Sequence, residues 1–303
     1  MLHASVGSGL LLGRVGAVGS NFIDVPAAGW APGDLSNAAN PYYLRFRTGA
    51  LAGRVLIVAA TANTATRLFL SNDGTDLTRT GLQGGAQGDV FELVLADTLG
   101  SFFGSGSLQG GTSAAGDSVQ VWNSDSWLTF YYNSANSRWQ RDSDSVASPA
   151  RNTFVLRPDR GLMITRNAAA DFKCYVTGRV PEHAPAYWHL RPGVTLLSIG
   201  LPVDVTLGSL AVQTRATGWQ VGANFATAGS DADLVRVWNG DSWLTFYYDT
   251  TNNRWQRYAD AAQTNRNPFV ISAGLPIFVH RLAASATATD SLVPLVLPYV
   301  LAP

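Results

Sequence analysis

Short runs of apolar residues separated by polar turns occupy most of the chain, and within many runs apolar and polar positions alternate. In the N-terminal part they include residues 10–18, 21–27, 42–49, 53–60 and 66–72. A hydrophobic period of two predicts β-strands, and many short strands joined by turns are typical of small barrels. We therefore predict an all-β chain that begins with a small β-barrel of about five or six strands.

The aromatic residues are concentrated in two stretches that are nearly identical. Residues 121–141 and 237–257 match at 16 of 21 positions, and looser matches continue to residues 166 and 281. Each stretch reads as strand, turn, strand, turn, strand, with residues 239–241 as a tight-turn signal. Two copies are too few for a solenoid, so the pattern predicts a tandem duplication of one sandwich-like or barrel-like β-domain.

This repeat divides the chain into four parts. We expect a barrel-like domain at residues 1–90, a first β-repeat domain at 91–180, a second at 187–282, and a linker with a C-terminal strand at 283–303. Each repeat is expected to open with an apolar strand, at residues 91–101 and 195–209. The segment 291–303 resembles such an opening strand without the rest of a unit.

Composition narrows the function classes. The 21 basic and 21 acidic residues give no formal net charge, and only 14% of the 303 residues are charged. Proteins that bind nucleic acid or anionic membrane surfaces need an excess of positive charge, so neither class is expected. No apolar run is long enough for a membrane-spanning helix. The N-terminus lacks the basic region of a signal peptide, and the single Cys174 allows no intramolecular disulfide.

Several motifs occur in a fixed order: GRVGAVGSNFIDVPAAGW at residues 13–30, TGALAGRVLIVAATANTATRLFL at 48–70, then the aromatic stretch ending in RWQR and an apolar close of the GLMITR type. This order resembles an uncharacterised family of exported, β-rich bacterial proteins of the Verrucomicrobia type, whose members often carry a C-terminal surface-sorting signal. The resemblance covers most of residues 10–282. It implies an extracellular or cell-surface location and no known activity.

The repeated aromatic stretch has two interpretations. Tryptophan and tyrosine rings offer flat apolar faces to sugars, so the stretch can form a platform for a polysaccharide partner. The same rings can instead pack in a core and pair across strands. We favour the core, because both faces of the central strand are apolar. The candidate platform residues are Trp122, Trp127, Tyr131, Trp139, Trp238, Trp243, Tyr247 and Trp255.

Catalytic and metal-binding motifs are not evident. The chain contains no GxSxG and no HExxH, and its glycine-rich segments at residues 7–13 and 103–111 lack the Lys-Ser/Thr of a phosphate loop. We expect no catalytic residues, no cofactor and no enzymatic activity. Asn72, Asp73 and Asp76 form a weak Ca²⁺ candidate, although the same residue types serve any hairpin loop.

The C-terminal segment is apolar and strand-like, and such a strand needs partners for its backbone and its side chains. It can fold back on its own second repeat, or it can add to the edge of a neighbouring copy and build a filament or layer. Pro294 and Pro298 favour an edge position. The residues expected to carry self-association are Leu292, Val293, Leu295, Val296, Leu297, Tyr299 and Val300.

We therefore predict a non-enzymatic structural protein, extracellular or on the cell surface, that self-associates through β-surfaces. The alternative is a glycan-binding adhesin that uses the repeated aromatic stretch. Few lysines protect the strand edges of this chain, which agrees with the first prediction.

Overall fold

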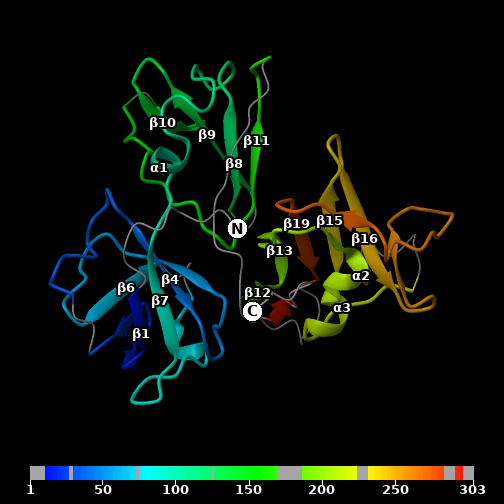
Figure 1. The fold of residues 1–303 in the computed structure, drawn as a ribbon, viewed down its shortest axis with the longest axis horizontal. Coiled ribbons are helices and arrows are strands. Elements are labelled where there is room, and N and C mark those ends of the chain that lie inside the picture. The colour runs from blue at the N-terminus through cyan, green and yellow to red at the C-terminus, as the bar shows by residue number, and fades with distance from the viewer. Residues whose placement is uncertain are drawn as a thin grey trace, which may run out of the picture.

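The computed structural model describes residues 11–26, 30–71, 75–123, 126–145, 147–169, 186–223, 231–282 and 291–295. Strands account for 37% of the chain and helices for 7%, which confirms the all-β prediction. The strands form three lobes, which we call the N-terminal unit (residues 11–95), the middle unit (97–169) and the C-terminal unit (186–295). Figure 1 shows them in blue to cyan, in green, and in yellow-green to red.

The N-terminal unit is a seven-stranded antiparallel sheet with the order β1-β7-β4-β5-β6-β3-β2. Its apolar side encloses one core, which includes Ile23, Leu44, Leu56 and Phe91, all fully buried. The elements are β1 (Leu11–Arg14), β2 (Ala17–Val18), β3 (Phe22–Asp24), β4 (Tyr42–Phe46), β5 (Val55–Val58), β6 (Arg67–Ser71), the 3-10 helix η1 (Leu77–Arg79) and β7 (Val90–Leu95).

This sheet does not close into a barrel within the described part of the chain, so the predicted closure is not confirmed. The two outermost strands, β1 and β2, are neighbours in sequence, and only residues 15 and 16 separate them. The chain crosses from one edge of the sheet to the other at this point. The outer edge of β1 has no partner among the described strands, and the sheet stays open there.

The boundary between the first two parts also differs from the prediction. The apolar strand β7, expected to open the first repeat, pairs with β1 and β4 of the N-terminal sheet. The physical reason is that Phe91 and Leu93 are needed on the core side of that sheet, where both are fully buried. The middle unit therefore begins with the helix that follows.

The middle unit packs one short helix on a four-stranded sheet with the order β10-β9-β8-β11. Thr98 caps the helix reciprocally with Ser101. Leu99 and Phe103 of the helix face Val119, Phe130 and other core residues of the sheet. The elements are α1 (Leu99–Phe103), β8 (Ser118–Trp122), β9 (Trp127–Asn133), β10 (Arg138–Arg141) and β11 (Leu162–Thr165).

The C-terminal unit repeats this pairing and extends it. Its main sheet has the order β13-β19-β15-β16-β17, in which β19-β15-β16-β17 corresponds to β11-β8-β9-β10. Two smaller sheets, β12-β20 and β14-β18, complete the unit. The elements are β12 (Ala186–Leu190), β13 (Gly193–Ser198), β14 (Val205–Thr206), α2 (Leu207–Leu210), α3 (Val212–Arg215), β15 (Leu234–Trp238), β16 (Trp243–Asp249), β17 (Arg254–Arg257), β18 (Val270–Ile271), β19 (Pro276–Arg281) and β20 (Ser291–Leu295).

The two aromatic stretches have the strand, turn, strand, turn, strand structure expected from their sequence. The pair Trp122↔Trp127 flanks the first turn of the middle unit, as the pair Trp238↔Trp243 does in the C-terminal unit. The tight turn of the second copy contains Gly240 with φ of 108°, a conformation that glycine adopts without strain.

The three units touch at defined points. Arg157 of the middle unit donates a hydrogen bond from Nη2 to the Val55 carbonyl of the N-terminal unit, at 2.6 Å. An isolated bridge joins Arg160 of the middle unit to Leu197 of the C-terminal unit.

Candidate functional site

Half of the expected sugar platform is core. Trp139 and Trp255 are 1% and 0% exposed, Tyr247 is 0% exposed and Tyr131 is also buried. Burial, with the charge of Asp249 second, raises the pKa of Tyr247 to about 12, and the neutral phenol donates a 2.9 Å hydrogen bond to Gln256 Oε1. A ring without an exposed face cannot bind a sugar, so these four residues form no platform in this structure.

The other four platform residues meet where the middle and C-terminal units touch. The ring centroids of Trp122 and Trp127 lie 5.2 Å apart, and both rings contact Phe278 edge-on, at 5.2 Å and 5.7 Å. On the other side Trp243 lies 4.7 Å from Phe278 and 5.3 Å from Trp238. We call these five rings the aromatic junction.

The aromatic junction joins the two copies of the repeat. The indole nitrogen of Trp122 donates to the Val194 carbonyl at 3.2 Å, across the two units. Phe278 lies in β19, outside the aromatic stretches, and the middle unit has Met163 at the corresponding position of β11. Sequence comparison of the repeats therefore gives no signal for Phe278, because only the second copy carries the ring.

Two polar side chains border Phe278 on the same face of the sheet. Arg236 is its cross-strand partner, and His280 follows it by two positions in β19. Arg236 Nε and His280 Nδ1 are buried and have no hydrogen-bond partner in the described part of the protein. Burial, and secondarily the charge of Arg236, lowers the pKa of His280 below its ordinary value. The imidazole is therefore neutral near pH 7.

A buried aspartate holds a loop in each of the three units. It stands directly before a strand, and one of its oxygens accepts a hydrogen bond from the backbone N–H of a glutamine that begins the preceding loop. The three bonds run from Gln83 to Asp89 at 2.9 Å, from Gln109 to Asp117 at 2.8 Å and from Gln220 to Asp233 at 3.0 Å.

We call this bond between the buried aspartate and the loop a clasp. In the two repeats an arginine also contacts the aspartate. Arg166 contacts Asp117 at 3.0 Å, and the almost fully buried Arg281 contacts Asp233 at 3.4 Å. Burial alone would raise the pKa of Asp117, but three backbone N–H groups and Arg166 outweigh it, so the pKa lies below its ordinary value. These carboxylates hold loops in place. The N-terminal unit shares this aspartate–glutamine bond with the two repeats, a similarity that the sequence comparison missed.

A second ion pair supports a pH prediction. Both oxygens of Asp144 accept hydrogen bonds from the Arg151 guanidinium, at 2.8 Å and 2.7 Å. These bonds are the largest cause that lowers the pKa of Asp144 to about 2. Because this lies below the unfolded value of about 3.9, the pair contributes stability above that value, and the contribution is lost as the pH falls through about 2. Carbon-13 NMR titration of the carboxyl group measures this pKa.

The variant Arg151→Met is expected to move the pKa of Asp144 up toward about 4. Asp260 is the matched control, because Arg266 holds it in the C-terminal unit and its pKa is lowered too. Its titration should stay unchanged in the Arg151 variant. An Asp144 titration near 4 in the unaltered protein would contradict the geometry.

The metal and catalytic candidates are only partly described. Asn72 and Asp73 of the Ca²⁺ candidate lie outside the described residues, as does Cys174. Asp76 caps η1, and its carboxylate accepts hydrogen bonds from the backbone N–H and the hydroxyl of Thr78, at 3.0 Å and 2.6 Å. Within the described part, no group of three His, Cys, Asp or Glu side chains is placed to hold a metal ion.

The C-terminal strand folds back on its own chain. β20 pairs antiparallel with β12, with Val293 opposite Trp188 and Leu295 opposite Ala186. Val293 is fully buried in the core of the C-terminal unit. Of the predicted self-association residues, Leu292, Val293 and Leu295 lie in β20, whereas Val296, Leu297, Tyr299 and Val300 lie outside the described residues.

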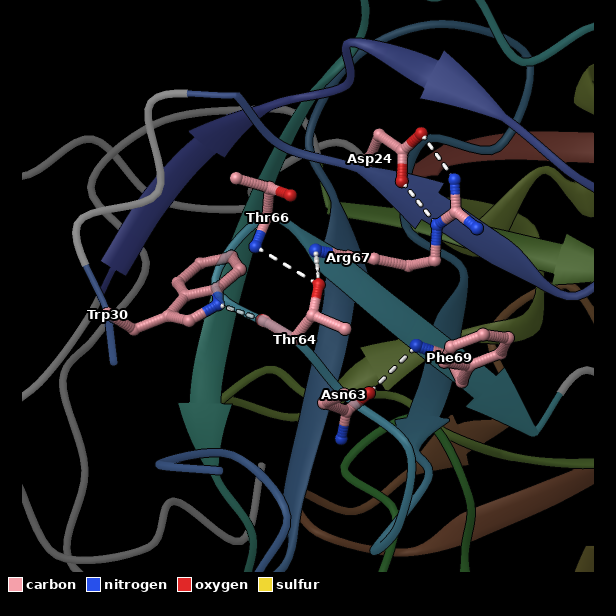
Figure 2. Close-up of polar contacts among 7 residues, drawn as sticks. All are labelled: Asp24, Trp30, Asn63, Thr64, Thr66, Arg67 and Phe69. Atoms are coloured by element: carbon pink, nitrogen blue, oxygen red, sulfur yellow. Dashed lines mark hydrogen bonds and ion pairs between the residues drawn. The ribbon is translucent and has the colours of Figure 1, made fainter. Parts of the chain in front are cut away.

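The N-terminal unit contains a cavity of about 610 Å³ where its sheet stays open. Trp30 is one of its lining residues, and its indole nitrogen donates to the Thr64 carbonyl at 2.8 Å (Figure 2). Nearby, Arg67 forms two hydrogen bonds with Asp24, at 2.6 Å and 2.9 Å. The lining residues used below are Leu11, Leu12, Arg14, Pro26, Trp30 and Phe91.

Comparison of the chain with family models, with curated proteins and with solved structures finds no match. The resemblance to exported bacterial proteins therefore stays a prediction. The described helices are all too short to cross a membrane.

Proposed function

We propose that this protein is a non-enzymatic structural protein that self-associates through its C-terminal strand, at the cell surface or outside the cell. β20 pairs with β12 of its own chain, so the proposal rests on the apolar sequence that follows this strand. β20 itself buries Val293 completely in a core. The apolar sequence continues from residue 296 to 302, beyond the pairing with β12 that is described, and supplies a segment for a neighbouring copy.

The prolines of this segment favour one-sided pairing. In an antiparallel strand, residues of one parity direct their backbone N–H and C=O groups to the same edge. Pro294 and Pro298 share one parity and lack N–H groups, so that edge is interrupted. From residue 291 to residue 301, the residues of the other parity all keep their N–H groups. Such a strand adds to an open sheet edge and does not invite a further strand on its other side.

The repeated units support the same proposal. Their shared strand pairing and their paired clasps agree with a tandem duplication of one β-domain. The aromatic junction fixes one copy against the other through ring contacts. A subunit whose repeated units contact each other and that carries a further apolar segment is suited to assembly into a filament or layer.

The test compares the full chain with a variant that lacks residues 296–303 but keeps β20. Mass photometry and negative-stain electron microscopy are expected to show oligomers or filaments for the full chain only. Replacing residues 296–303 by a Gly/Ser sequence of equal length is the matched control for chain length, and it should behave like the truncation. Circular dichroism verifies that all three proteins are folded.

Single particles from the full chain at every concentration would overturn self-association. Glycan binding would then be the function to screen, because a specific observation favours it as the second candidate. The tryptophans of the aromatic junction are only half-buried, and Arg236 and His280 beside them carry nitrogen atoms without partners in the described structure. Such a group of rings and polar donors is what a sugar site requires.

A further inference from the structure

The open side of the N-terminal sheet has the features of a strand acceptor. β1 is an outermost strand of the sheet, and Leu12 is 65% and Leu11 42% exposed along it. The cavity of about 610 Å³ lies beside this strand. An exposed, apolar sheet edge next to a cavity is the usual setting for strand addition, in which backbone bonds give affinity and pockets accept alternate side chains.

The backbone groups that face this edge can be assigned. Val15 donates from its backbone N–H to the Asp89 carbonyl at 2.9 Å, which continues the pairing of β1 with β7. Because the hydrogen-bonding direction alternates along a strand, Leu11 and Gly13 also pair toward β7. Leu12 and Arg14 therefore direct their N–H and C=O groups toward the open edge.

The cavity is preformed and mostly apolar. Its floor is set by Phe91, whose ring lies so close to Gly13 that a Cβ atom there would be 2.4 Å from the ring. The Trp30 ring also lines it, held in place by the hydrogen bond to Thr64 (Figure 2). Among the described residues that line it, Arg14 is the only charged one. An uncharged, apolar strand fits such a cavity better than a charged one.

We propose that the acceptor of the C-terminal strand is this edge of a second copy, so that residues 297–301 of one chain add beside β1 of the next. The inference rests on the proposed self-association and names its site. Residues 291–303 contain no charged side chain, which matches the lining of the cavity. Positions 297, 299 and 301 keep their donors, because Pro294 and Pro298 interrupt only the opposite edge, and two successive positions of these three pair with Leu12 and Arg14.

The same alternation decides which side chains of the added strand face the cavity. Val293 already faces a core, and in an added strand alternation would place Leu297, Tyr299 and Leu301 on one side. In the proposed complex these three side chains would enter the cavity, and Val300 would face solvent. β20 belongs to the C-terminal unit and β1 to the N-terminal unit (Figure 1), so repeated addition joins copies head to tail and yields an open filament.

The test uses a fluorescent peptide of residues 291–303 and the variant that lacks residues 296–303. Fluorescence anisotropy is expected to show saturable binding. Leu12→Pro removes the N–H at the open edge without touching the bonds to β7, and we expect it to weaken binding at least tenfold. Leu12→Ala keeps the N–H and removes only part of the apolar edge, so it should weaken binding much less than Leu12→Pro. In the peptide, Tyr299→Asp should abolish binding, and Val300→Asp should have little effect.

The outcomes separate this inference from the proposed function. If the full chain assembles through its tail but Leu12→Pro assembles equally well, the acceptor lies elsewhere and only the inference fails. If the full chain never assembles, the proposed function fails, and the peptide titration still reports whether the edge accepts a strand. Peptide binding that needs removal of residues 1–9 would show that the chain's own N-terminus occupies the cavity, and would also overturn the inference.

Discussion

Replacing Trp255 by alanine is expected to lower the free energy of unfolding of the C-terminal unit by about 3–5 kcal/mol. Trp255 is 0% exposed, and its ring lies 6.1 Å from Trp219 and 5.7 Å from Tyr248, centroid to centroid. Removing the indole leaves a large cavity that the surrounding strands cannot fill. Urea unfolding followed by circular dichroism measures the loss.

Trp238→Ala is the matched control from the same aromatic stretch. Trp238 is half-buried at the edge of the aromatic junction and contacts Trp243, so we expect a smaller loss of about 1 kcal/mol. A Trp255 variant as stable as the unaltered protein would show that this ring is not core. It would also reopen the sugar platform at the four residues that the structure buries.

Replacing Asp233 by alanine is the second change with a large expected effect, about 3–5 kcal/mol of stability. The variant leaves the Arg281 guanidinium, which is 1% exposed, without its carboxylate. The N–H groups of Gln220 and Leu282 lose their acceptor as well, at 3.0 Å and 2.7 Å in the unaltered protein. Thermal unfolding by calorimetry is the measurement.

Two further variants test whether the unpaired charge of Arg281 causes the loss of stability. The double variant Asp233→Ala/Arg281→Leu should recover part of the stability, because it removes the unpaired buried charge. The corresponding Asp117→Ala should cost less, since the Arg166 side chain is 27% exposed and water can solvate it. Equal losses for Asp117→Ala and Asp233→Ala, with no recovery in the double variant, would contradict the buried ion pair as the cause.

The aromatic stretches show how one sequence pattern serves two purposes. In each copy the ring in the last strand of the aromatic stretch, Trp139 or Trp255, fills a core. The rings at the first turn of the stretch lie at the boundary between the units. The preference for core over platform is therefore right for half of the rings. The remaining four pair across strands, Trp122 with Trp127 and Trp238 with Trp243, which the structural interpretation includes. Their meeting at Phe278, between the copies of the repeat, was not anticipated.

The sequence supports the fold class and the strand–turn–strand order because these depend on short-range features. Alternation of apolar and polar residues sets which residues can share a face of a sheet, and the Asn-Gly-Asp signal at residues 239–241 sets a tight turn. The repeat is visible for the same reason. Two copies of one local pattern reach the same pairing, Trp122 with Trp127 and Trp238 with Trp243.

The sequence by itself determined the strands of this protein, their likeness between the repeats and the apolar character of the tail. Only the tertiary structure decided that β7 completes the N-terminal sheet, that the rings converge on Phe278, that β20 pairs with β12 and that the sheet stays open beside β1. These features join residues far apart in the chain. They depend on which of several apolar surfaces buries best against another, a competition that a local pattern does not encode.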